Sequence, residues 1–239
     1  MKCLPKIIAV VGTTASGKTD LAIELAKEFD GELLSCDSRQ MYKEMDIGTN
    51  KDRSFPHHLY DLVFPNERFT VADFQKIASQ TIEEIVSRGT LPILVGGTAM
   101  YVTALLQNWD INDGKGEPLY DALLLAPNLS RDVVYDRINK RVDQMVKDGL
   151  VEEVKYIAEK YGYKTVAMTG NAYQQIAKYH LGEWSLERAI EESKKVTRNY
   201  AKRQWTWWGK PGHQPGPHGH VHWVQNKDEA VRLVKEFLK

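Results

Sequence analysis

A glycine-rich segment near the start of the chain limits its possible folds more than any other feature. Residues 12–19 read GTTASGKT, which matches the pattern G-x-x-x-x-G-K-[ST]. The apolar residues 7–11 precede it, and a helix-like pattern follows from Asp20. In this context backbone N–H groups and a lysine bind an oligophosphate, and the final hydroxyl binds Mg²⁺. The predicted phosphate-binding residues are Gly12, Thr13, Thr14, Ala15, Ser16, Gly17, Lys18 and Thr19, with Thr19 as the metal ligand.

Short apolar segments recur along the chain between amphipathic stretches. Helical periodicity runs over residues 21–29 and 74–86, and the chain is mostly helical for nearly a hundred residues after the fourth apolar segment. Strands that alternate with helices indicate a mostly parallel sheet. We therefore predict an α/β fold, with a P-loop NTPase-like parallel sheet flanked by helices and a helical C-terminal region. The predicted strands occupy residues 6–11, 32–36, 91–95, 122–126 and 221–224.

The length and composition fit one main domain. With 239 residues, of which 42% are hydrophobic, the chain can bury a sizeable core. Polar, glycine-rich stretches at 110–118 and 209–219 indicate linkers. We divide the chain into a first part of the P-loop core, a short linker, and the remaining core strands with the helical region. These parts span residues 1–109, 110–121 and 122–239.

The sequence also indicates a compartment. No apolar run is long enough to span a bilayer, and no signal peptide precedes the first strand. The two cysteines, Cys3 and Cys36, form no metal or redox motif. We expect a cytoplasmic protein without membrane contact, in which each cysteine is a small buried hydrophobe.

The formal net charge is zero, so binding to nucleic acid would need a local basic patch. Residues 194–210 supply six basic side chains and no acidic one, interleaved with aromatic residues. An alternative is a solvated helix face followed by core aromatics, and composition does not separate the two. The residues concerned are Lys194, Lys195, Arg198, Lys202, Arg203 and Lys210, with Tyr200, Trp205, Trp207 and Trp208.

Polar side chains follow the predicted strands at the edge where ligands bind in open α/β sheets. Asp37 follows the second strand and is the best candidate for a general base, because Lys18 and a bound Mg²⁺ would favour its ionised form. It could instead cap a helix or hold Mg²⁺ through water. The third strand ends in paired glycines and Thr98, which allow close backbone approach and offer a hydroxyl. No acidic residue follows that strand directly, which counts against ATP hydrolysis.

Taken together, these segments resemble the tRNA dimethylallyltransferase (tRNA isopentenyltransferase) family. The run DSRQMYKEMDIGT is far more specific than the P-loop motif alone. The matching segments follow the family's order and cover most of the chain: TASGKTDLAIELA, DSRQMYKEMDIGT at 37–49, HHLYD at 57–61, FTVADFQ at 69–75, LPILVGGTAMYV at 91–102, RINKRVDQMVKDGLVEEV at 137–154 and TRNYAKRQWTW at 197–207.

The resemblance implies transfer of a dimethylallyl group from dimethylallyl diphosphate to N6 of an adenosine next to the anticodon in tRNA. Diphosphate leaves, and the P-loop with Mg²⁺ would stabilise the charge that grows on it. The adenine would have to flip out of the stacked anticodon loop into the site. We expect a monomer that binds the donor, Mg²⁺ and the tRNA anticodon loop, but no membrane.

The family pattern also implies residue roles. Asp37 would take the N6 proton, while Lys18 and Thr19 would bind the diphosphate with the ion. Thr98 would line the channel between donor and acceptor, and Arg198 and Arg203 would lie near the diphosphate or the RNA backbone. The implied catalytic residues are Asp37, Lys18, Thr98 and Arg203, and the implied tRNA-binding residues are Asp37, Ser38, Arg39, Gln40, Thr98 and Arg198.

Two stretches depart from the family pattern. Only about twenty residues, including DINDGKGEP, separate the third and fourth predicted strands, where the family carries a long helical insertion that grips the anticodon stem. Residues 168–176 (MTGNAYQQI) lack a basic side chain that the family places there.

Three other functions stay open. A transferase that acts on a free adenine nucleotide such as AMP would need no RNA-gripping insertion. A small-molecule kinase would use Asp37 on a substrate hydroxyl and Arg131, Arg137 or Arg141 on ATP. A catalytically silent protein would bind RNA without releasing diphosphate.

The spacing of four histidines raises the question of a metal site. His213, His218, His220 and His222 cluster near the C-terminus, but no cysteine or carboxylate joins them, which favours surface histidines. His57 and His58 lie in a family motif, and we expect them to brace the site.

Overall fold

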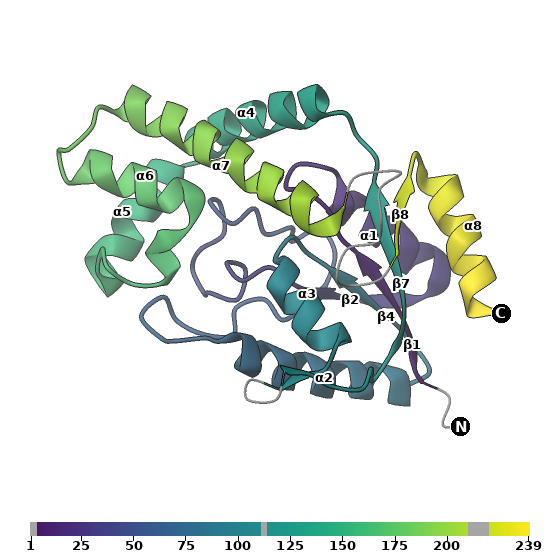
Figure 1. Cartoon of the computed structure of the whole chain (residues 1–239). Helices are drawn as coiled ribbons and strands as arrows, with labels where there is room; N and C mark the ends of the chain where they lie inside the picture. The colour runs from purple at the N-terminus through teal and green to yellow at the C-terminus, as the bar shows by residue number, and fades with distance from the viewer. Residues whose placement is uncertain (1–3, 111–113, 210–219) are drawn as a thin grey trace.

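A parallel six-stranded sheet forms the centre of the molecule (Figure 1). The computed structural model describes residues 4–110, 114–209 and 220–239. The strand order is β3-β2-β4-β1-β7-β8, and every neighbouring pair is parallel. The strands of this sheet are β1 (Lys6–Val10), β2 (Gly31–Ser35), β3 (His57–His58), β4 (Leu91–Val95), β7 (Asp121–Pro127) and β8 (Val221–Val224).

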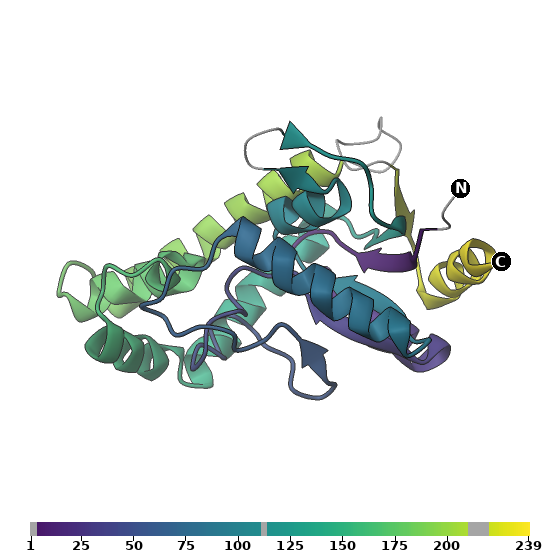
Figure 2. The same ribbon diagram turned by 90° about the horizontal axis from the view of Figure 1, so that it is seen from below.

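Helices cover both faces of the sheet because successive strand residues point to opposite sides. Ile7 and Ala9 of β1 pack in one buried cluster with α2, α3 and the end of α7. Ile8 and Val10 pack in a second cluster with α1 and α8. Figure 2 shows α2 running along its face of the sheet. These helices are α1 (Lys18–Phe29), α2 (Val71–Ser87), α3 (Ala99–Leu106) and α8 (Lys227–Leu238).

A helical lobe lies at the end of the sheet where the P-loop leaves β1 (Figure 1). The side chains of Ser130 and Ser185 accept N–H groups in the first turns of α4 and α7, so each helix begins at a hydroxyl cap. At its start α7 packs in the lobe through Ala189, and at its end Trp208 is buried against the sheet. The lobe contains α4 (Arg131–Lys147), α5 (Leu150–Tyr161), the 3₁₀ helix η1 (Ala167–Thr169), α6 (Asn171–His180) and α7 (Leu186–Trp208).

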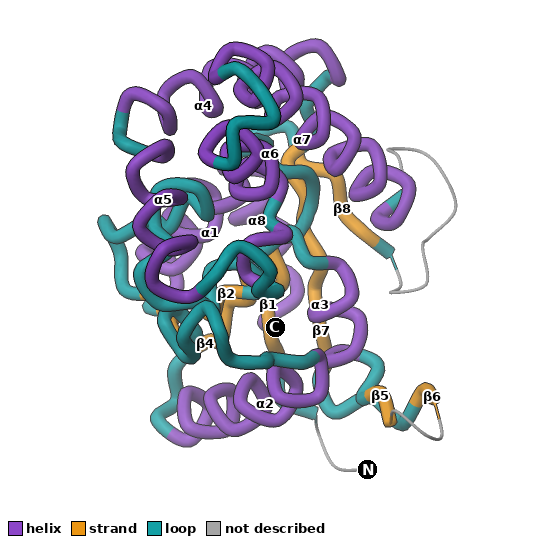
Figure 3. Tube along the Cα trace, turned by 90° about the vertical axis from the view of Figure 1, so that its left-hand side faces the viewer, coloured by secondary structure: helices purple, strands orange, loops and turns teal. Residues whose placement is uncertain are grey.

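The structure confirms the predicted α/β class and all five predicted strands, each within a residue or two of its expected bounds. It adds the edge strand β3 and a small antiparallel hairpin of β5 (Trp109–Asp110) and β6 (Gly114–Lys115). The hairpin contacts α3, and Figure 3 shows it on the side of the molecule away from α5 and α6. It occupies part of the predicted linker at 110–118, so that segment is not wholly irregular.

Some predictions fall on residues outside the described ranges. These are Cys3, Lys210, His213, His218, residues 111–113 of one predicted linker and 210–219 of the other. Cys36 is buried, as predicted, and burial raises the pKa of its thiol. None of the described helices combines the length and the hydrophobicity that a bilayer crossing requires.

Candidate active site

The P-loop has the backbone geometry of an anion-binding turn. Gly12 and Gly17 have φ angles of 124° and 85°, which favour glycine, and Ala15 also has a positive φ of 61°. Gly17 is the N-cap of α1, so the free N–H groups of that helix terminus belong to the loop. The side chain of Ser16 is buried, and its Oγ has no hydrogen-bond partner among the residues that the structure describes.

Lys18 begins α1 and faces the loop, where its Nζ donates to the carbonyl oxygen of Thr13 at 3.3 Å. Burial, and to a lesser extent the charge of Arg141, lower the pKa of Lys18 to about 8. The charge of Asp37 opposes both effects. Because the Asp37 carboxylate acts on the Lys18 ammonium in this way, the two predicted catalytic groups lie within electrostatic reach of each other.

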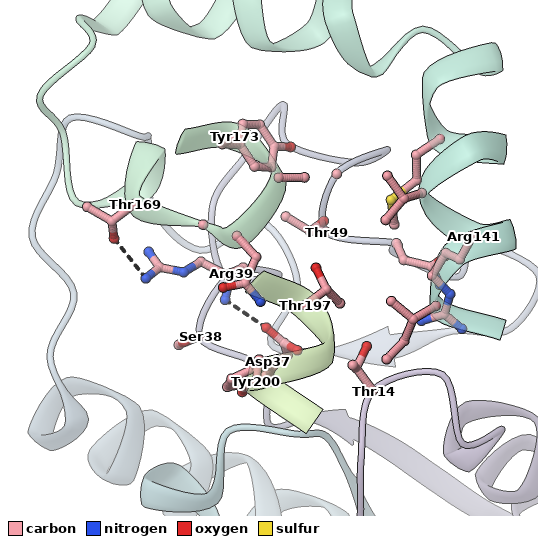
Figure 4. Close-up of a pocket in the computed structure, with 18 of the residues that line it drawn as sticks. Thr14, Asp37, Ser38, Arg39, Thr49, Arg141, Thr169, Tyr173, Thr197 and Tyr200 are labelled. Atoms are coloured by element: carbon pink, nitrogen blue, oxygen red, sulfur yellow. Dashed lines mark hydrogen bonds between the residues drawn. The ribbon is translucent and has the colours of Figure 1, made fainter. Parts of the chain in front are cut away.

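Asp37 follows β2 in a tight turn. Its Oδ1 accepts the N–H of Arg39 at 2.9 Å. No helix begins in residues 37–50, so the alternative in which Asp37 caps a helix is wrong. The turn holds the carboxylate by one oxygen and directs it into the cavity described next (Figure 4).

A cavity of about 340 Å³ lies between the sheet and the helical lobe (Figure 4). Asp37, Thr14 of the P-loop, Arg141 of α4 and Arg203 of α7 all line it. Its wall combines hydroxyls, one carboxylate, three arginines and a few apolar side chains, a composition suited to a charged ligand with an apolar part. The residues that line it are Thr14, Asp37, Ser38, Arg39, Gly48, Thr49, Asn50, Ile138, Arg141, Val142, Met145, Thr169, Gly170, Asn171, Ala172, Tyr173, Thr197, Tyr200 and Arg203.

The paired glycines after β4 bring two strand ends together. A Cβ atom on Gly96 would lie 2.4 Å from the carbonyl carbon and oxygen of Cys36, so only glycine fits there. Thr98 then accepts the N–H of Ser38 on its Oγ1 at 3.0 Å. The close backbone approach predicted for this segment is therefore confirmed, and Thr98 contacts Ser38 rather than the described cavity.

Arg39 and Gln40 both contact other parts of the protein. Arg39 lines the cavity, and its guanidinium donates to the Val166 carbonyl at 2.7 Å and to the Thr169 hydroxyl at 3.0 Å (Figure 4). The Gln40 amide donates to the carbonyl oxygens of Thr49 and Asn50 at 3.2 and 3.3 Å. Gln40 thus holds the loop that forms one side of the cavity without lining the cavity itself.

The two arginines predicted on the basic helix differ in position. Arg203 lines the cavity, and its guanidinium lies over the ring of Tyr200. Arg198 donates to the side-chain oxygen of Asn139 at 2.6 Å and so joins α7 to α4 outside the cavity. The basic segment is also partly neutralised, because Lys194 pairs with Asp143 and Glu191, and Lys195 pairs with Glu192.

A carboxylate that sequence reasoning did not single out anchors the loop at the cavity rim. Glu153 of α5 accepts the N–H groups of Asp46, Ile47 and Gly48 at 2.8, 2.8 and 2.9 Å, and the hydroxyl of Tyr173 at 2.5 Å. Three main-chain donors on one carboxylate fix the loop conformation. Glu153 therefore ties the helical lobe to the segment that follows β2.

Two further residues of the site, Tyr200 and Arg141, belong to sequence features that predict other roles for them. Tyr200 donates to the Gly97 carbonyl at 3.1 Å, and burial together with the Asp37 charge raises the pKa of its phenol to about 12, so it stays neutral. Arg141, a lid residue in the kinase alternative, lines the cavity near Lys18. Its spacing after Arg137 on an amphipathic helix was the available signal.

The histidines do not form a metal site in the described ranges. No group of three or more His, Cys, Asp or Glu side chains there is placed to hold a metal ion. His58 contacts the Glu32 carboxylate at 2.7 Å, and His57 stacks on Tyr60 with ring centroids 4.8 Å apart. Both lie on the edge strand β3 and outside the cavity lining, so they brace the sheet edge rather than the site itself.

Comparisons with known proteins identify the family. The family model described as IPP transferase matches residues 40–118 and 111–210, and the model described as isopentenyl transferase matches residues 5–62. A tRNA dimethylallyltransferase of Acetivibrio thermocellus is 35% identical, with 98% of each chain covered. That alignment runs over 314 positions, more than this chain contains, so the relative carries segments that have no counterpart here.

Solved structures agree. The tRNA isopentenylpyrophosphate transferase of Bacillus halodurans matches with a TM-score of 0.86 and 32% identity, covering 98% of this chain and 95% of the other. The corresponding transferase of Staphylococcus epidermidis matches with a TM-score of 0.86 and 30% identity, covering 97% of this chain and 99% of the other. The extent of these matches shows that the chain belongs to the tRNA dimethylallyltransferase family.

Proposed function

We propose that the protein transfers a dimethylallyl group from dimethylallyl diphosphate to N6 of an adenosine next to the anticodon of tRNA. The observation that carries this proposal is that Asp37, the P-loop residue Thr14 and Arg203 line one cavity. A proton acceptor beside a diphosphate cradle is what an amine needs to displace diphosphate from an allylic carbon. The family's name and its solved structures support the choice of tRNA as acceptor.

In the reaction the allylic carbon–oxygen bond breaks, diphosphate leaves with the electron pair, and N6 forms the new bond to carbon. The P-loop N–H groups and the Lys18 ammonium would hold the departing diphosphate. Asp37 would accept the N6 proton on the carboxylate oxygen that does not hold the turn. Arg141 and Arg203 would add positive charge around the donor, and Ser38 and Arg39 would contact the acceptor nucleotide.

Mg²⁺ fits the donor set of the loop. This ion usually takes one or two protein oxygens together with substrate phosphates and water, so it needs no cluster of carboxylates. Thr19, in the first turn of α1, supplies a hydroxyl, and the unpartnered Ser16 Oγ supplies another polar atom for the bound diphosphate. When bound, Mg²⁺ would neutralise part of the charge that grows on the leaving group. We also expect a monomer that works in the cytoplasm.

Analysis of tRNA nucleosides by mass spectrometry tests the proposal. The protein is incubated with dimethylallyl diphosphate, Mg²⁺ and unmodified tRNA, and the digested RNA is examined for N6-dimethylallyladenosine. Formation of that nucleoside supports the proposal, and its absence under conditions that modify AMP would contradict it.

A free adenine nucleotide is the second candidate acceptor. The connection between α3 and β7 spans only residues 107–120, which is short for a segment expected to grip an RNA stem. A parallel incubation with AMP separates the two acceptors, because prenylated AMP without prenylated tRNA would favour the nucleotide.

A further inference from the structure

Gln204 of α7 joins the P-loop to the end of β4. Its side chain is only 3% exposed. The amide oxygen accepts the N–H of Thr14 at 2.7 Å, and the amide nitrogen donates to the carbonyl oxygen of Gly97 at 2.8 Å. Tyr200, one turn earlier on the same helix, donates to the same carbonyl. The Thr14 N–H is thus satisfied by the protein itself and is not one of the donors left for the diphosphate.

The space for this amide depends on a glycine. A Cβ atom on Gly97 would lie 2.4 Å from Nε2 of Gln204, closer than any real Cβ contact. Any side chain at position 97 would therefore push the amide away from Thr14 or from Gly97. Gly97 is therefore required by the Gln204 side chain, whereas Gly96 is required by the main chain of Cys36.

The two hydrogen bonds of Gln204 connect the donor side of the cavity to the acceptor side. Thr14 belongs to the phosphate loop and lines the cavity. Gly97 precedes Thr98, whose hydroxyl accepts the N–H of Ser38, the residue next to Asp37. A continuous path of hydrogen bonds and short chain segments therefore runs from the phosphate loop through Gln204 to the base that would accept the proton.

We propose that Gln204 is a positioning residue that sets the distance between the bound diphosphate ester and the acceptor amine. The inference rests on the proposed function. When the spacing is wrong, the carbon–oxygen bond can still break and diphosphate still departs with the electron pair. Water then bonds to the allylic carbon in place of N6 and releases its proton to solvent. The products are dimethylallyl alcohol and diphosphate, formed without prenylated adenosine.

The test compares two products of one reaction. Diphosphate and N6-dimethylallyladenosine are measured together, with tRNA and dimethylallyl diphosphate saturating, for the wild type, Gln204→Met and Gly97→Ala. Methionine keeps the length of glutamine without its hydrogen bonds. We expect about one diphosphate per prenylated adenosine in the wild type, and at least about twice that ratio in both variants, with kcat for prenyl transfer lowered by about tenfold or more.

Gln175→Met is the matched control. Gln175 is a buried glutamine of α6 that does not line the cavity, so this substitution also replaces a buried amide by a thioether but leaves the site untouched. We expect its product ratio to stay at the wild-type value. The ratio is independent of the fraction of folded protein, so a variant that merely folds less well does not change it.

Each outcome has a distinct meaning. A ratio of one in both Gln204→Met and Gly97→Ala overturns the inference, whatever happens to the rate. An equal rise in Gln175→Met also overturns it, because the effect would then be a general consequence of core substitutions. Absence of prenylated adenosine in the wild type would instead refute the proposed function.

Discussion

The two walls of the cavity are built and held in different ways. The wall next to the sheet consists of short segments that leave β1 and β2, so the parallel strands fix the positions of Thr14 and Asp37. The second wall comes from α4, α6 and α7, and on α4 the apolar Ile138, Val142 and Met145 lie on the same side as Arg141. That wall is joined to the sheet side by hydrogen bonds between residues far apart in the chain, such as Glu153 to the 46–48 loop.

We infer from this difference that the two walls have different roles, one in the chemical step and the other in ligand binding. The sheet side supplies the Asp37 carboxylate, the phosphate-binding N–H groups and Arg39, while the helix side supplies Arg141, Arg203 and apolar side chains. Substitutions of cavity-lining residues on the sheet side should therefore lower kcat, and substitutions of cavity-lining residues or lobe contacts on the helix side should change affinity or stability. Gln204 of α7 does not line the cavity and falls outside this division, because it holds the phosphate loop and the end of β4. The following predictions test that division, and each can contradict it.

The largest effect is expected on the sheet side. Asp37→Ala should lower the rate of prenyl transfer by about 10²-fold or more, because a general base is lost, while donor affinity stays largely intact. Asp37→Asn is the matched variant, since its amide oxygen can still accept the Arg39 N–H and keep the turn. Single-turnover rates and donor titration measure the two quantities. Near-normal turnover in Asp37→Asn would show that the turn, and not proton transfer, is what the residue supplies.

The next effect concerns the link between the lobe and the sheet. Glu153→Gln leaves one acceptor oxygen for four donors and introduces an amide N–H group among them, so we expect a loss of about 2 kcal/mol in the free energy of unfolding. Urea denaturation measures it. The neighbouring Glu152→Gln is the control, because Glu152 is exposed, and it should stay within about 0.5 kcal/mol of the wild type. Equal stability of the two variants would mean that the loop does not depend on the helical lobe.

The arginines of α7 should differ from each other. Arg203 lines the cavity, so Arg203→Ala should weaken binding of the donor or the RNA by roughly tenfold and reduce the salt dependence of RNA affinity. Arg198→Ala should have a smaller effect on affinity, because Arg198 is bound to Asn139 outside the cavity. Titrations at several salt concentrations compare them. If Arg198→Ala reduces the salt slope as much, the RNA extends beyond the described cavity along α7.

The smallest effect is a pH dependence. The pKa of Lys18 is lowered to about 8, mainly by burial, so the free protein loses this ammonium as the pH rises through that value. We expect kcat/KM for the donor to fall above about pH 8, since this parameter reports ionisations of the free enzyme. Arg141→Gln removes a charge that lowers the same pKa, so its alkaline limb should move to higher pH. An unchanged limb in that variant would assign the ionisation to another group.

Features encoded by neighbouring residues could be predicted from the sequence. The P-loop and Asp37 were found because their residues are adjacent to apolar strand segments, and the five strands because their hydrophobic runs are continuous. The strand β3 was missed because two residues, His57 and His58, carry no periodicity, and only pairing with β2 defines it. The antiparallel hairpin β5–β6 is equally short.

Features that depend on distant residues could not be predicted. Gln204 and Thr14 are 190 positions apart in the sequence, and Glu153 and Asp46 are 107 apart. No local sequence pattern therefore predicts either contact. The positions of Arg198 and Arg203 were also not separable, because both sit in one basic run and only the packing of α7 directs one of them to the cavity. Their individual roles therefore stay predictions.

The connection between α3 and β7 is short, so it offers few residues that could contact the RNA far from the reacting base. Because few residues could contact the rest of the RNA, selection of the substrate would depend on the few nucleotides that enter the cavity. An isolated anticodon hairpin should then be modified nearly as efficiently as the whole L-shaped molecule.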